Sequence, residues 1–491
     1  MKRLFLYGLT FVGVVYFARW VVRLFGLVVL ALVLSALSYG AIGTSMVWEV
    51  RSGASTNSGG GFDSTVAAPG TDYSQQASAE FNYTDLVIGG TTTLVTSVAR
   101  PFSTLEPGNV IKITAGTGCT TGRYYVVSVS VITATLDRSA GTGASTCTAY
   151  LGGSMPYTDI VSGPVAGNVV WVKADGNHNQ SADTVFNVGS SARYTTLAGY
   201  TTTRGDNGQA TLRVTAGSVR PLRVDGGYNI VKNFIADCNG QTNCNSARFA
   251  GQNTMIQNLK SLSPTTSAGV EFANNNIICV SCAVTGAGSA IPGFSMLGTG
   301  DFCFYCVAVS GAGHGFTIAD RDGCFFCVAG NNSGASSDGF SLGSATVFLS
   351  SCVAYGNGRD GVRYAAGSAA PNAMVSNCVL VSNTGYGIND STGSSNSAQQ
   401  QMLLYNAFFS NTAGARNQVF AGDGDVTLTA APFTNGAGND FSLNSTAGGG
   451  AALKSVGFPG ALVLGGTGYL DIGALQVAAA AATVTVGYPV Q

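Results

Sequence analysis

The sequence predicts an all-β chain folded as a parallel β-helix solenoid. A cysteine-bearing phrase returns about once every two dozen residues, as Cys279-Val-Ser-Cys282, Cys303-Phe-Tyr-Cys306 and Cys324-Phe-Phe-Cys327, and a period of this length is typical of a solenoid. The units between phrases hold two or three short apolar strands separated by Gly, Asn and Ser turns, so they are too short for a helix pair. They fit rungs whose strands pair with their equivalents in the next rung.

Two columns of small or apolar residues keep step along the chain. The anchor column consists of Phe234, Leu259, Cys282, Cys306, Cys327, Cys352, Cys378 and Ala407. The second column, three residues earlier, consists of Val231, Ile256, Cys279, Cys303, Cys324, Leu349, Val375 and Leu404. An odd spacing would place the two columns on opposite faces of a flat strand. We therefore expect a bend between them, with Asn or Ser at the corner and both columns pointing inward.

These rungs resemble those of the right-handed parallel β-helix repeat proteins, the pectate-lyase-like group. Residues 48–62 are similar to the opening strand of such proteins, 168–174 to an early rung, and 440–443 and 471–476 to their closing segment. Many members occur in phage tails and on bacterial surfaces, so the resemblance implies an extracellular, cell-surface or virion protein. It specifies a fold and leaves the activity open.

The chain divides into four parts. Residues 1–45 carry basic residues around two apolar runs, which predicts a signal peptide or a membrane anchor; translation could instead begin at Met46. Residues 46–155 are expected to form an opening strand and a small antiparallel subdomain that covers the first rung. The β-helix should occupy 156–430, and 431–491 should cap the other end.

Composition excludes some classes of partner. Only 10% of the residues are charged and the net charge is −1, so no basic field is available for nucleic acid. We expect membrane contact only through residues 1–45. Uncharged outer faces rich in Thr, Ser and Asn suit contacts with a polysaccharide or a cell-surface glycan, with virion partners, or with further copies of the chain in a trimer.

The cysteines have two expected roles. Cys119 with Cys147, and Cys238 with Cys244, are predicted disulfides of an exported protein. The remaining eight belong to the two columns, where Leu, Ile, Val, Phe or Ala replaces them in other rungs. That interchange favours packing, since a buried Cys behaves as a small hydrophobe. We therefore expect a mostly reduced, dry ladder and no metal.

The candidate site lies in the column before a repeating glycine, where His314, Asp338 and Asp360 would stack on consecutive rungs. Arg359 and Arg363 join them, and Glu271, Thr317 and Asn389 share a column with Arg363. Two stacked carboxylates could hold Ca²⁺ or act as an acid/base pair, and lyases of this fold suggest Arg363 as proton acceptor. The alternative is a solvated turn column, because Asp and Gly are good turn residues.

Two tyrosines near this column, Tyr364 and Tyr386, are candidates for stacking on sugar rings. Gly313-His-Gly315 looks like an element of the polygalacturonases, but the paired aspartates and the Arg-Ile-Lys of that family are missing. The predicted function is therefore glycan binding or appendage building, in the manner of a tail-spike or adhesin. The alternatives are a polysaccharide lyase or glycoside hydrolase, and a purely structural fibre or coat component.

Overall fold

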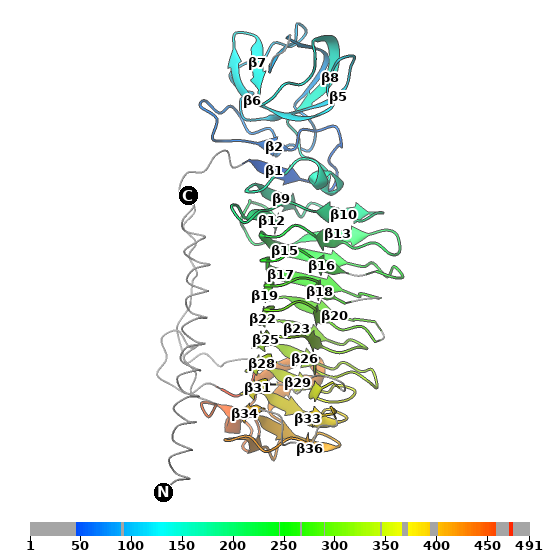
Figure 1. The fold of residues 1–491 in the computed structure, drawn as a ribbon, viewed down its shortest axis with the longest axis vertical. Helices are drawn as coiled ribbons and strands as arrows, with labels where there is room; N and C mark the ends of the chain where they lie inside the picture. The colour runs from blue at the N-terminus through cyan, green and yellow to red at the C-terminus, as the bar shows by residue number, and fades with distance from the viewer. Residues whose placement is uncertain are drawn as a thin grey trace. The chain divides into compact units, whose positions relative to one another are not determined.

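The computed structural model describes residues 46–474, except 90–92, 245, 266–267, 289, 344–345, 366–371, 393–400 and 458–470. The predicted export or anchor segment 1–45 and the end of the tail lie outside the described residues. Within the described part, no helix is long and apolar enough to cross a membrane. The chain forms stacked rungs whose strands pair in parallel from one rung to the next, which confirms the predicted β-helix (Figure 1).

Each rung contributes a strand to each of three parallel sheets. The first sheet contains β1 (Val47–Val50), β9 (Val169–Lys173), β12 (Thr195–Tyr200), the first halves of β15 (Asn229–Asp237) and β17 (Met255–Leu262), β19 (Ile278–Val280), β22 (Phe302–Phe304), β25 (Asp322–Phe325), β28 (Thr346–Ser350), β31 (Asn372–Ser376) and β34 (Met402–Leu404). The second contains β10 (Asn177–Gln180), β13 (Ala210–Val214), the second halves of β15 and β17, β20 (Ala283–Thr285), β23 (Val307–Val309), β26 (Val328–Gly330), β29 (Val353–Tyr355), β32 (Val379–Val381), β35 (Ala407–Phe409) and β37 (Val426–Thr427). The third contains β11 (Val185–Phe186), β14 (Leu222–Val224), β16 (Ala247–Phe249), β18 (Val270–Phe272), β21 (Phe294–Met296), β24 (Phe316–Ile318), β27 (Phe340–Leu342), β30 (Val362–Tyr364), β33 (Tyr386–Asp390) and β36 (Gly414–Asn417).

A sharp corner separates the first sheet from the second in every rung. One residue per rung adopts a left-handed backbone conformation there: Asn233, Asn258, Ser281, Tyr305, Phe326, Ser351, Asn377 and Tyr405, with φ between 52° and 65°. Asn tolerates this region better than most residues, while bulky side chains rarely adopt it. The corner turns the chain so that both cysteine columns face the interior, as predicted, and all of their cysteines are buried.

The predicted columns need one correction at the last rung. Val375 pairs with Leu403 and Val379 with Ala407, so Asn406 and not Ala407 continues the anchor column. Leu403 likewise replaces Leu404 in the second column. The buried Asn406 is tolerated because its side chain accepts a hydrogen bond from the Cys378 N–H (3.1 Å) and donates one to the Val375 carbonyl (2.9 Å).

Side-chain ladders fill the interior. Phe294, Phe316 and Phe340 stack with ring centroids 4.8 and 5.0 Å apart. The glycine before each of these strands permits close packing of the rungs, since a Cβ at Gly339 would lie 2.6 Å from the Gly361 carbonyl oxygen. A second ladder, which the sequence analysis missed, joins the amides of Asn332, Asn357, Asn383 and Asn411, with 2.9 Å between successive donors and acceptors.

An antiparallel subdomain is inserted between the opening hairpin and β9. β1 and β2 (Gly61–Phe62) pair antiparallel, and β1 also pairs with β9 as a rung strand. The subdomain is a closed sheet of β3 (Phe81–Ile88), β4 (Leu94–Thr96), β7 (Thr133–Leu136), β6 (Gly122–Ser130), β5 (Val110–Ala115) and β8 (Ala144–Leu151), followed by the 3-10 helix η1 (Tyr157–Val161). It has its own apolar core.

The described part of the C-terminal segment, which was expected to cap the end of the solenoid, packs on its side, over the second sheet. It comprises β38 (Phe433–Asn435), η2 (Gly436–Gly438), β39 (Asp440–Leu443) and η3 (Gly450–Leu453). The outward residues beneath it are apolar, among them Val309, Val353, Val379 and Val381. Phe441 meets the Tyr355 ring at 5.6 Å, and Asn331 donates to the Gly436 carbonyl at 3.0 Å. Burial of this apolar strip holds the segment in place.

Candidate functional site

The predicted charged column lies at the start of four third-sheet strands. His314, Asp338, Asp360 and Tyr386 occupy equivalent positions of consecutive rungs. In each of the first three rungs, the N–H of the glycine directly after this residue donates a hydrogen bond to the carbonyl oxygen of the equivalent residue in the next rung. These bonds join Gly315 to Asp338, Gly339 to Asp360 and Gly361 to Tyr386, each at 2.9 Å. The structure therefore brings together the residues that the sequence placed in this site.

Asp338 is neutralised within the protein. Its carboxylate is fully buried and accepts from Nε and Nη2 of Arg359 at 2.7 and 2.6 Å. The Asp360 N–H also donates to Asp338 Oδ1 at 3.2 Å. Such a bidentate ion pair between a carboxylate and a guanidinium is among the strongest in proteins. The hydrogen bonds to Asp338 raise the pKa of Arg359 above its ordinary value.

Asp360 is held in the same way on the next rung. Its Oδ2 accepts from Arg363 Nη1 at 2.9 Å and from the Asn389 amide at 2.7 Å, while Oδ1 accepts from the Tyr386 N–H at 2.7 Å. Only 1% of the residue is exposed. Both aspartates thus hold arginines and backbone in place at this corner.

His314 is a neutral hydrogen-bond donor in this arrangement. Its Nδ1 accepts from the Asp338 N–H at 3.1 Å, which assigns the proton of the neutral ring to Nε2. Burial lowers the pKa of His314, and the attraction of Asp338 only partly opposes that effect. With Nδ1 occupied and Nε2 protonated, the ring has no free basic nitrogen at neutral pH.

This site does not fit Ca²⁺ or acid/base chemistry. Ca²⁺ needs six to eight oxygen ligands, whereas the carboxylate oxygens of Asp338 and Asp360 already accept from arginine, amide or backbone donors. An arginine bound to a carboxylate stays protonated, so Arg363 cannot accept a proton. The corner instead presents donors: the His314 Nε2–H and those guanidinium N–H groups that the aspartates leave free.

The two candidate tyrosines differ. Tyr364 is fully buried in the solenoid core, so it cannot stack on a ligand. Its position in β30 alternates with Arg363, which faces outward. Tyr386 is half-buried at the same edge as His314 and remains a candidate for stacking on a sugar ring.

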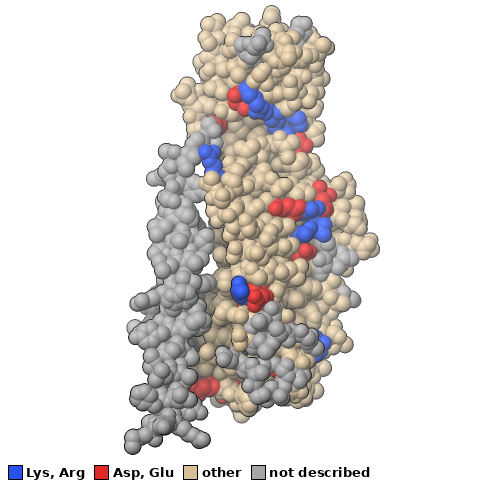
Figure 2. Space-filling view, viewed as in Figure 1, with Lys and Arg blue, Asp and Glu red and all other residues tan. Residues whose placement is uncertain are grey.

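The outer face of the third sheet extends this site along the solenoid. The residues that face outward there are Arg223, Arg248, Glu271, Ser295, Thr317, Ser341, Arg363, Asn389 and Asn417, which register as one column across nine rungs. This confirms that Glu271, Thr317 and Asn389 share a column with Arg363. All nine side chains are polar; Ser295, Ser341 and Asn389 are buried and the other six are half-buried. On the face of the molecule that Figure 2 shows, charged side chains gather in small clusters of mixed sign on an otherwise uncharged surface.

Aromatic residues that the sequence analysis passed over lie between the cysteines of the repeated phrase. Tyr305 and Phe326 occupy the corner with stacked rings 4.9 Å apart, and Tyr305 is 53% exposed. Phe304 and Phe325 stack beside them at 5.2 Å. The alternation of a strand could have revealed them, because the residue after an inward cysteine must face outward.

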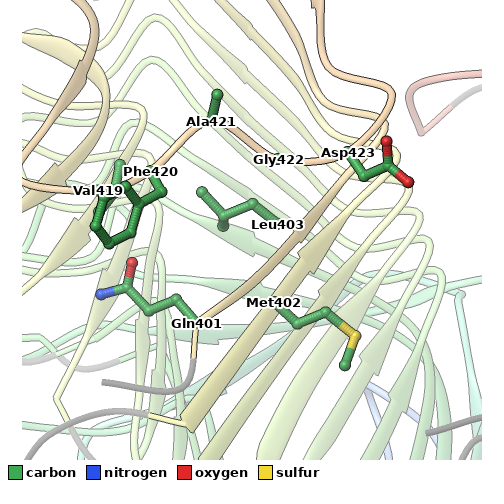
Figure 3. A pocket seen from close by; sticks show the side chains of 8 residues that line it. All are labelled: Gln401, Met402, Leu403, Val419, Phe420, Ala421, Gly422 and Asp423. Carbon is green, nitrogen blue, oxygen red and sulfur yellow. The ribbon is translucent and has the colours of Figure 1, made fainter. Parts of the chain in front are cut away.

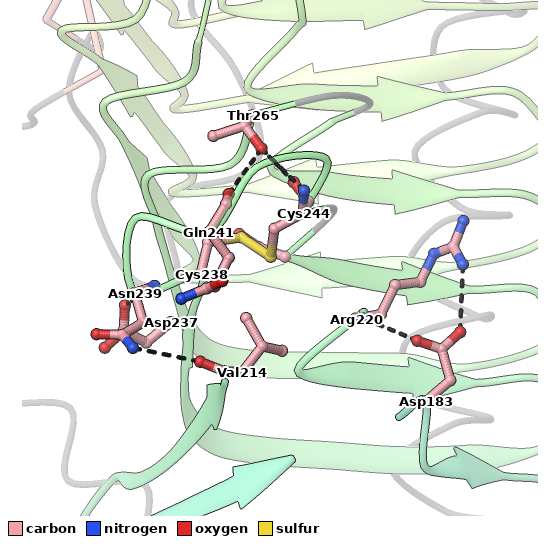
Figure 4. Close-up of a disulfide and its surroundings, with 10 residues drawn as sticks. Asp183, Val214, Arg220, Asp237, Cys238, Asn239, Gln241, Cys244 and Thr265 are labelled. Carbon is pink, nitrogen blue, oxygen red and sulfur yellow. Dashed lines mark hydrogen bonds and ion pairs between the residues drawn. A yellow bond between two sulfur atoms is a disulfide. The ribbon is translucent and has the colours of Figure 1, made fainter. Parts of the chain in front are cut away.

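The structure forms both disulfides that the sequence predicted. Cys119 and Cys147 bridge the subdomain with Cα atoms 6.0 Å apart. Cys238 and Cys244 close one loop, where Thr265 accepts from the Cys244 N–H at 2.8 Å (Figure 4).

Six of the eight ladder cysteines are free thiols, in line with the expected mostly reduced ladder, and the remaining two form a disulfide that was not expected. Cys279 and Cys282 form a third disulfide within one rung, with Cα atoms 6.5 Å apart. Equivalent cysteines of neighbouring rungs have parallel Cβ vectors, which disfavour a disulfide between rungs. The corner at Ser281 instead turns the two cysteines of one rung toward each other. The other six cysteines are buried thiols.

A pocket of about 210 Å³ lies at the last rung, away from the charged column. Its walls are β34 and the segment 419–423, with Phe420 and Leu403 facing it (Figure 3). Among the described residues that line it, Asp423 is the one with a charged side chain, and none of them was singled out from the sequence.

Comparisons with known proteins concern the fold. No family model and no curated protein matches the sequence. Among solved structures, pectate lyase Pel9A is similar at 17% identity, with a TM-score of 0.49 over 66% of this chain and 91% of that one. The tailspike protein gp49 of Pseudomonas phage LKA1 is similar at 12% identity, with a TM-score of 0.19 over 71% and 67%. A PL6 family polysaccharide lyase of Pseudopedobacter saltans is similar at 11% identity, with a TM-score of 0.31 over 55% and 89%. The rungs themselves establish that this chain is a parallel β-helix repeat protein.

Proposed function

We propose that this protein is a surface or virion-associated β-helix that binds an extended glycan along the outer face of its third sheet, without cleaving it. The observation that carries this proposal is the unbroken polar column from Arg223 to Asn417. Hydroxyl, amide, guanidinium and carboxylate groups recur there once per rung, at about 4.8 Å. A linear polymer of sugars lying along the axis meets a partly exposed polar side chain at six of the nine rungs, because Ser295, Ser341 and Asn389 are buried.

The charged corner supports binding over catalysis. A lyase or glycosidase needs a carboxylate or another base that is free to take a proton. The two carboxylates of this corner are engaged by Arg359 and Arg363, and His314 has no free basic nitrogen. What remains for a ligand are donors, which suit the hydroxyl and carboxylate oxygens of a glycan.

The disulfides support an extracellular or virion setting. Bonds such as Cys119–Cys147 and Cys238–Cys244 form and persist in oxidising compartments. The low charge of the chain also suits a protein that meets uncharged or weakly acidic polymers and not nucleic acid.

A paired binding and cleavage assay tests the proposal. Purified protein is titrated with a panel of neutral and acidic polysaccharides by calorimetry, and the same mixtures are examined for new reducing ends and unsaturated sugars. We expect binding without new ends. Thr317→Ala should weaken binding about threefold to tenfold, since a lost neutral hydrogen bond is worth about 0.5–1.5 kcal/mol.

Arg138→Ala is the matched control for a surface polar residue, because Arg138 lies in the N-terminal subdomain and pairs with Asp137. It should leave binding unchanged. New reducing ends would show an enzyme and overturn the proposal. Absence of binding to every polymer, combined with assembly into a repeating particle, would favour a purely structural component.

A further inference from the structure

The disulfide across the corner of one rung has two structural counterparts. Cys279 pairs in register with Cys303, and Cys303 with Cys324, along the first sheet. Each of these cysteines is followed three residues later by the partner cysteine of its own rung. The corner residues between them, Ser281, Tyr305 and Phe326, have φ values of 54°, 55° and 56°. The backbone therefore repeats the geometry that brings Cys279 and Cys282 together.

The sulfur atoms of the anchor column are also placed alike. Sγ of Cys282 lies 3.5 Å from the carbonyl oxygen of Val280, Sγ of Cys306 3.4 Å from that of Phe304, and Sγ of Cys327 3.4 Å from that of Phe325. In each rung the sulfur thus approaches the carbonyl two residues earlier. Equivalent backbone and equivalent sulfur placement make the same bond available in all three rungs.

We propose that Cys303–Cys306 and Cys324–Cys327 are further disulfide sites, so that three consecutive rungs can carry a bond across the corner between the first and second sheets. Cys352 and Cys378 mark the end of the series. Their rungs have Leu349 and Val375 where the partner cysteine would stand, so these two thiols stay free.

Closure of each pair needs an oxidant, for which a small disulfide such as oxidised glutathione suffices. The thiolate of Cys306 attacks one glutathione sulfur and releases the first glutathione thiolate. The thiolate of Cys303 then attacks the Cys306 sulfur of the mixed disulfide, forms Cys303–Cys306 and releases the second glutathione. The pair loses two electrons and two protons, and the oxidant is reduced to two thiols.

The timing of closure follows from burial. Cys303, Cys306, Cys324 and Cys327 are fully buried. Burial raises the pKa of the Cys303, Cys324 and Cys327 thiols, whereas the pKa of Cys306, despite the same burial, is lowered by its contacts with Cys303 and Cys327. Attack in the folded protein is prevented because glutathione cannot reach sulfur atoms that are fully buried. The bonds therefore form before these rungs pack, and the folded protein retains whichever state it was folded in.

A metal centre is the competing use of these sulfurs. Sγ atoms of Cys279, Cys282 and Cys306 all lie within 4.8 Å of one another. Metal binding requires thiolates, and several thiolates in a dry interior carry a large desolvation cost. A disulfide is neutral, so the apolar surroundings accept it without that cost.

Peptide mapping of the full chain tests the proposal. The protein is refolded in a mixture of oxidised and reduced glutathione, free thiols are alkylated after rapid denaturation, and chymotrypsin cuts the chain after Phe304 or Tyr305 and after Phe325 or Phe326. These cuts separate the partners of each proposed bond, so each bond joins two peptides. We expect joined peptides for Cys303–Cys306 and Cys324–Cys327, and alkylation of Cys352 and Cys378 alone.

Two variants sharpen the result. Cys303→Val should leave Cys306 alkylated and Cys324–Cys327 closed, whereas Cys352→Val should leave both pairs closed. Alkylation of Cys303, Cys306, Cys324 and Cys327 under conditions that close Cys119–Cys147 would overturn the proposal. Peptides joined between rungs, such as Cys303 with Cys324, or one equivalent of tightly held zinc or copper, would overturn it as well.

Discussion

The solenoid should lose stability as the pH rises from 4 to 8, because two aspartates are buried one above the other without a cation. Asp301 lies directly before β22, and Asp322 is the first residue of β25 on the next rung. Both are fully buried. The Asp301 N–H donates to Asp322 Oδ1 at 2.8 Å, yet Oδ2 of each residue has no hydrogen-bond partner among the described residues. The nearest arginine in sequence, Arg321, is 74% exposed and pairs with Asp320.

Burial raises the pKa of Asp301 to about 7 and that of Asp322 to about 8, from an ordinary value of 3.8. Backbone N–H groups such as that of Gly298 oppose the rise without completing a bond to either Oδ2. Because the folded pKa exceeds the unfolded one, the folded state binds more protons between pH 4 and 8. The contribution of these two residues to the free energy of unfolding is then highest below pH 4, falls through this window and levels off above pH 8.

The size of the loss follows from the same values. At about 1.4 kcal/mol per pKa unit, Asp322 alone destabilises the alkaline protein by about 6 kcal/mol. The two carboxylates repel each other, so their separate losses do not add. Asp322→Asn keeps the shape of a protonated Asp322 and removes its charge. It should raise the free energy of unfolding by about 4–6 kcal/mol at pH 8.5 but by only about 1.7 kcal/mol at pH 5, which lies little more than one unit above the ordinary pKa of 3.8.

Urea unfolding at both pH values measures this effect. Hydrogen exchange of the amides in β22 and β25 localises it, since neighbouring rungs of a solenoid can open separately. Asp440→Asn is the control, because the pKa of the exposed Asp440 is lowered by its bonds to Ser442 and its removal should give no alkaline gain. An unfolding free energy that is the same at pH 5 and 8.5, or a gain in Asp322→Asn that does not depend on pH, would refute the reasoning.

Three further substitutions probe the ladders and the charged corner by urea midpoint. Gly339→Val should cost about 2–3 kcal/mol, because its Cβ would meet the Gly361 oxygen at 2.6 Å, whereas Gly53→Val has no atom within 4 Å and should be neutral. Asn357→Leu should lower the free energy of unfolding by about 2–4 kcal/mol, because the Asn332 and Asn383 amides lose their hydrogen-bond partner. The exposed Asn57→Leu is the control, and an equal loss of stability in both variants would contradict a stabilising role of the ladder. Arg359→Met should lower the free energy of unfolding by about 3 kcal/mol near neutral pH, because Asp338 is left buried and unpaired. Adding Asp338→Asn should restore most of that stability. No recovery in the double variant would show that lost packing, and not the unpaired charge, explains the effect.

The repeating columns were predictable because every rung repeats the same local problem. Gly315, Gly339 and Gly361 recur where neighbouring rungs approach most closely, and Cys306 or Cys327 recurs where a small inward side chain is needed. The predicted register was wrong by one residue at the last rung, where Asn406, and not Ala407, occupies the anchor column. A polar residue in an apolar column conceals the register, because only its hydrogen bonds make it acceptable there.

The candidate site shows the complementary limit. Its members were found from the column before the glycine, and the structure does stack His314, Asp338 and Asp360. Their chemistry could not be assigned from spacing, because it depends on side chains that approach from the next rung. Arg359 forms an ion pair with Asp338, and Arg363 forms one with Asp360. Two carboxylates that looked catalytic in the sequence are therefore neutralised, and the corner offers mainly hydrogen-bond donors.

The sequence by itself determined the solenoid, the inward columns, the Asn- or Ser-rich corner and the two loop disulfides. All of these depend on residues close in the chain or repeated at the rung period. Only the tertiary structure decided which sulfurs meet across a corner, where the C-terminal segment packs, which carboxylates have a cation and that Tyr364 points inward. The physical reason is that hydrogen bonding, burial and charge pairing depend on distances between atoms of different rungs, which no period in the sequence specifies.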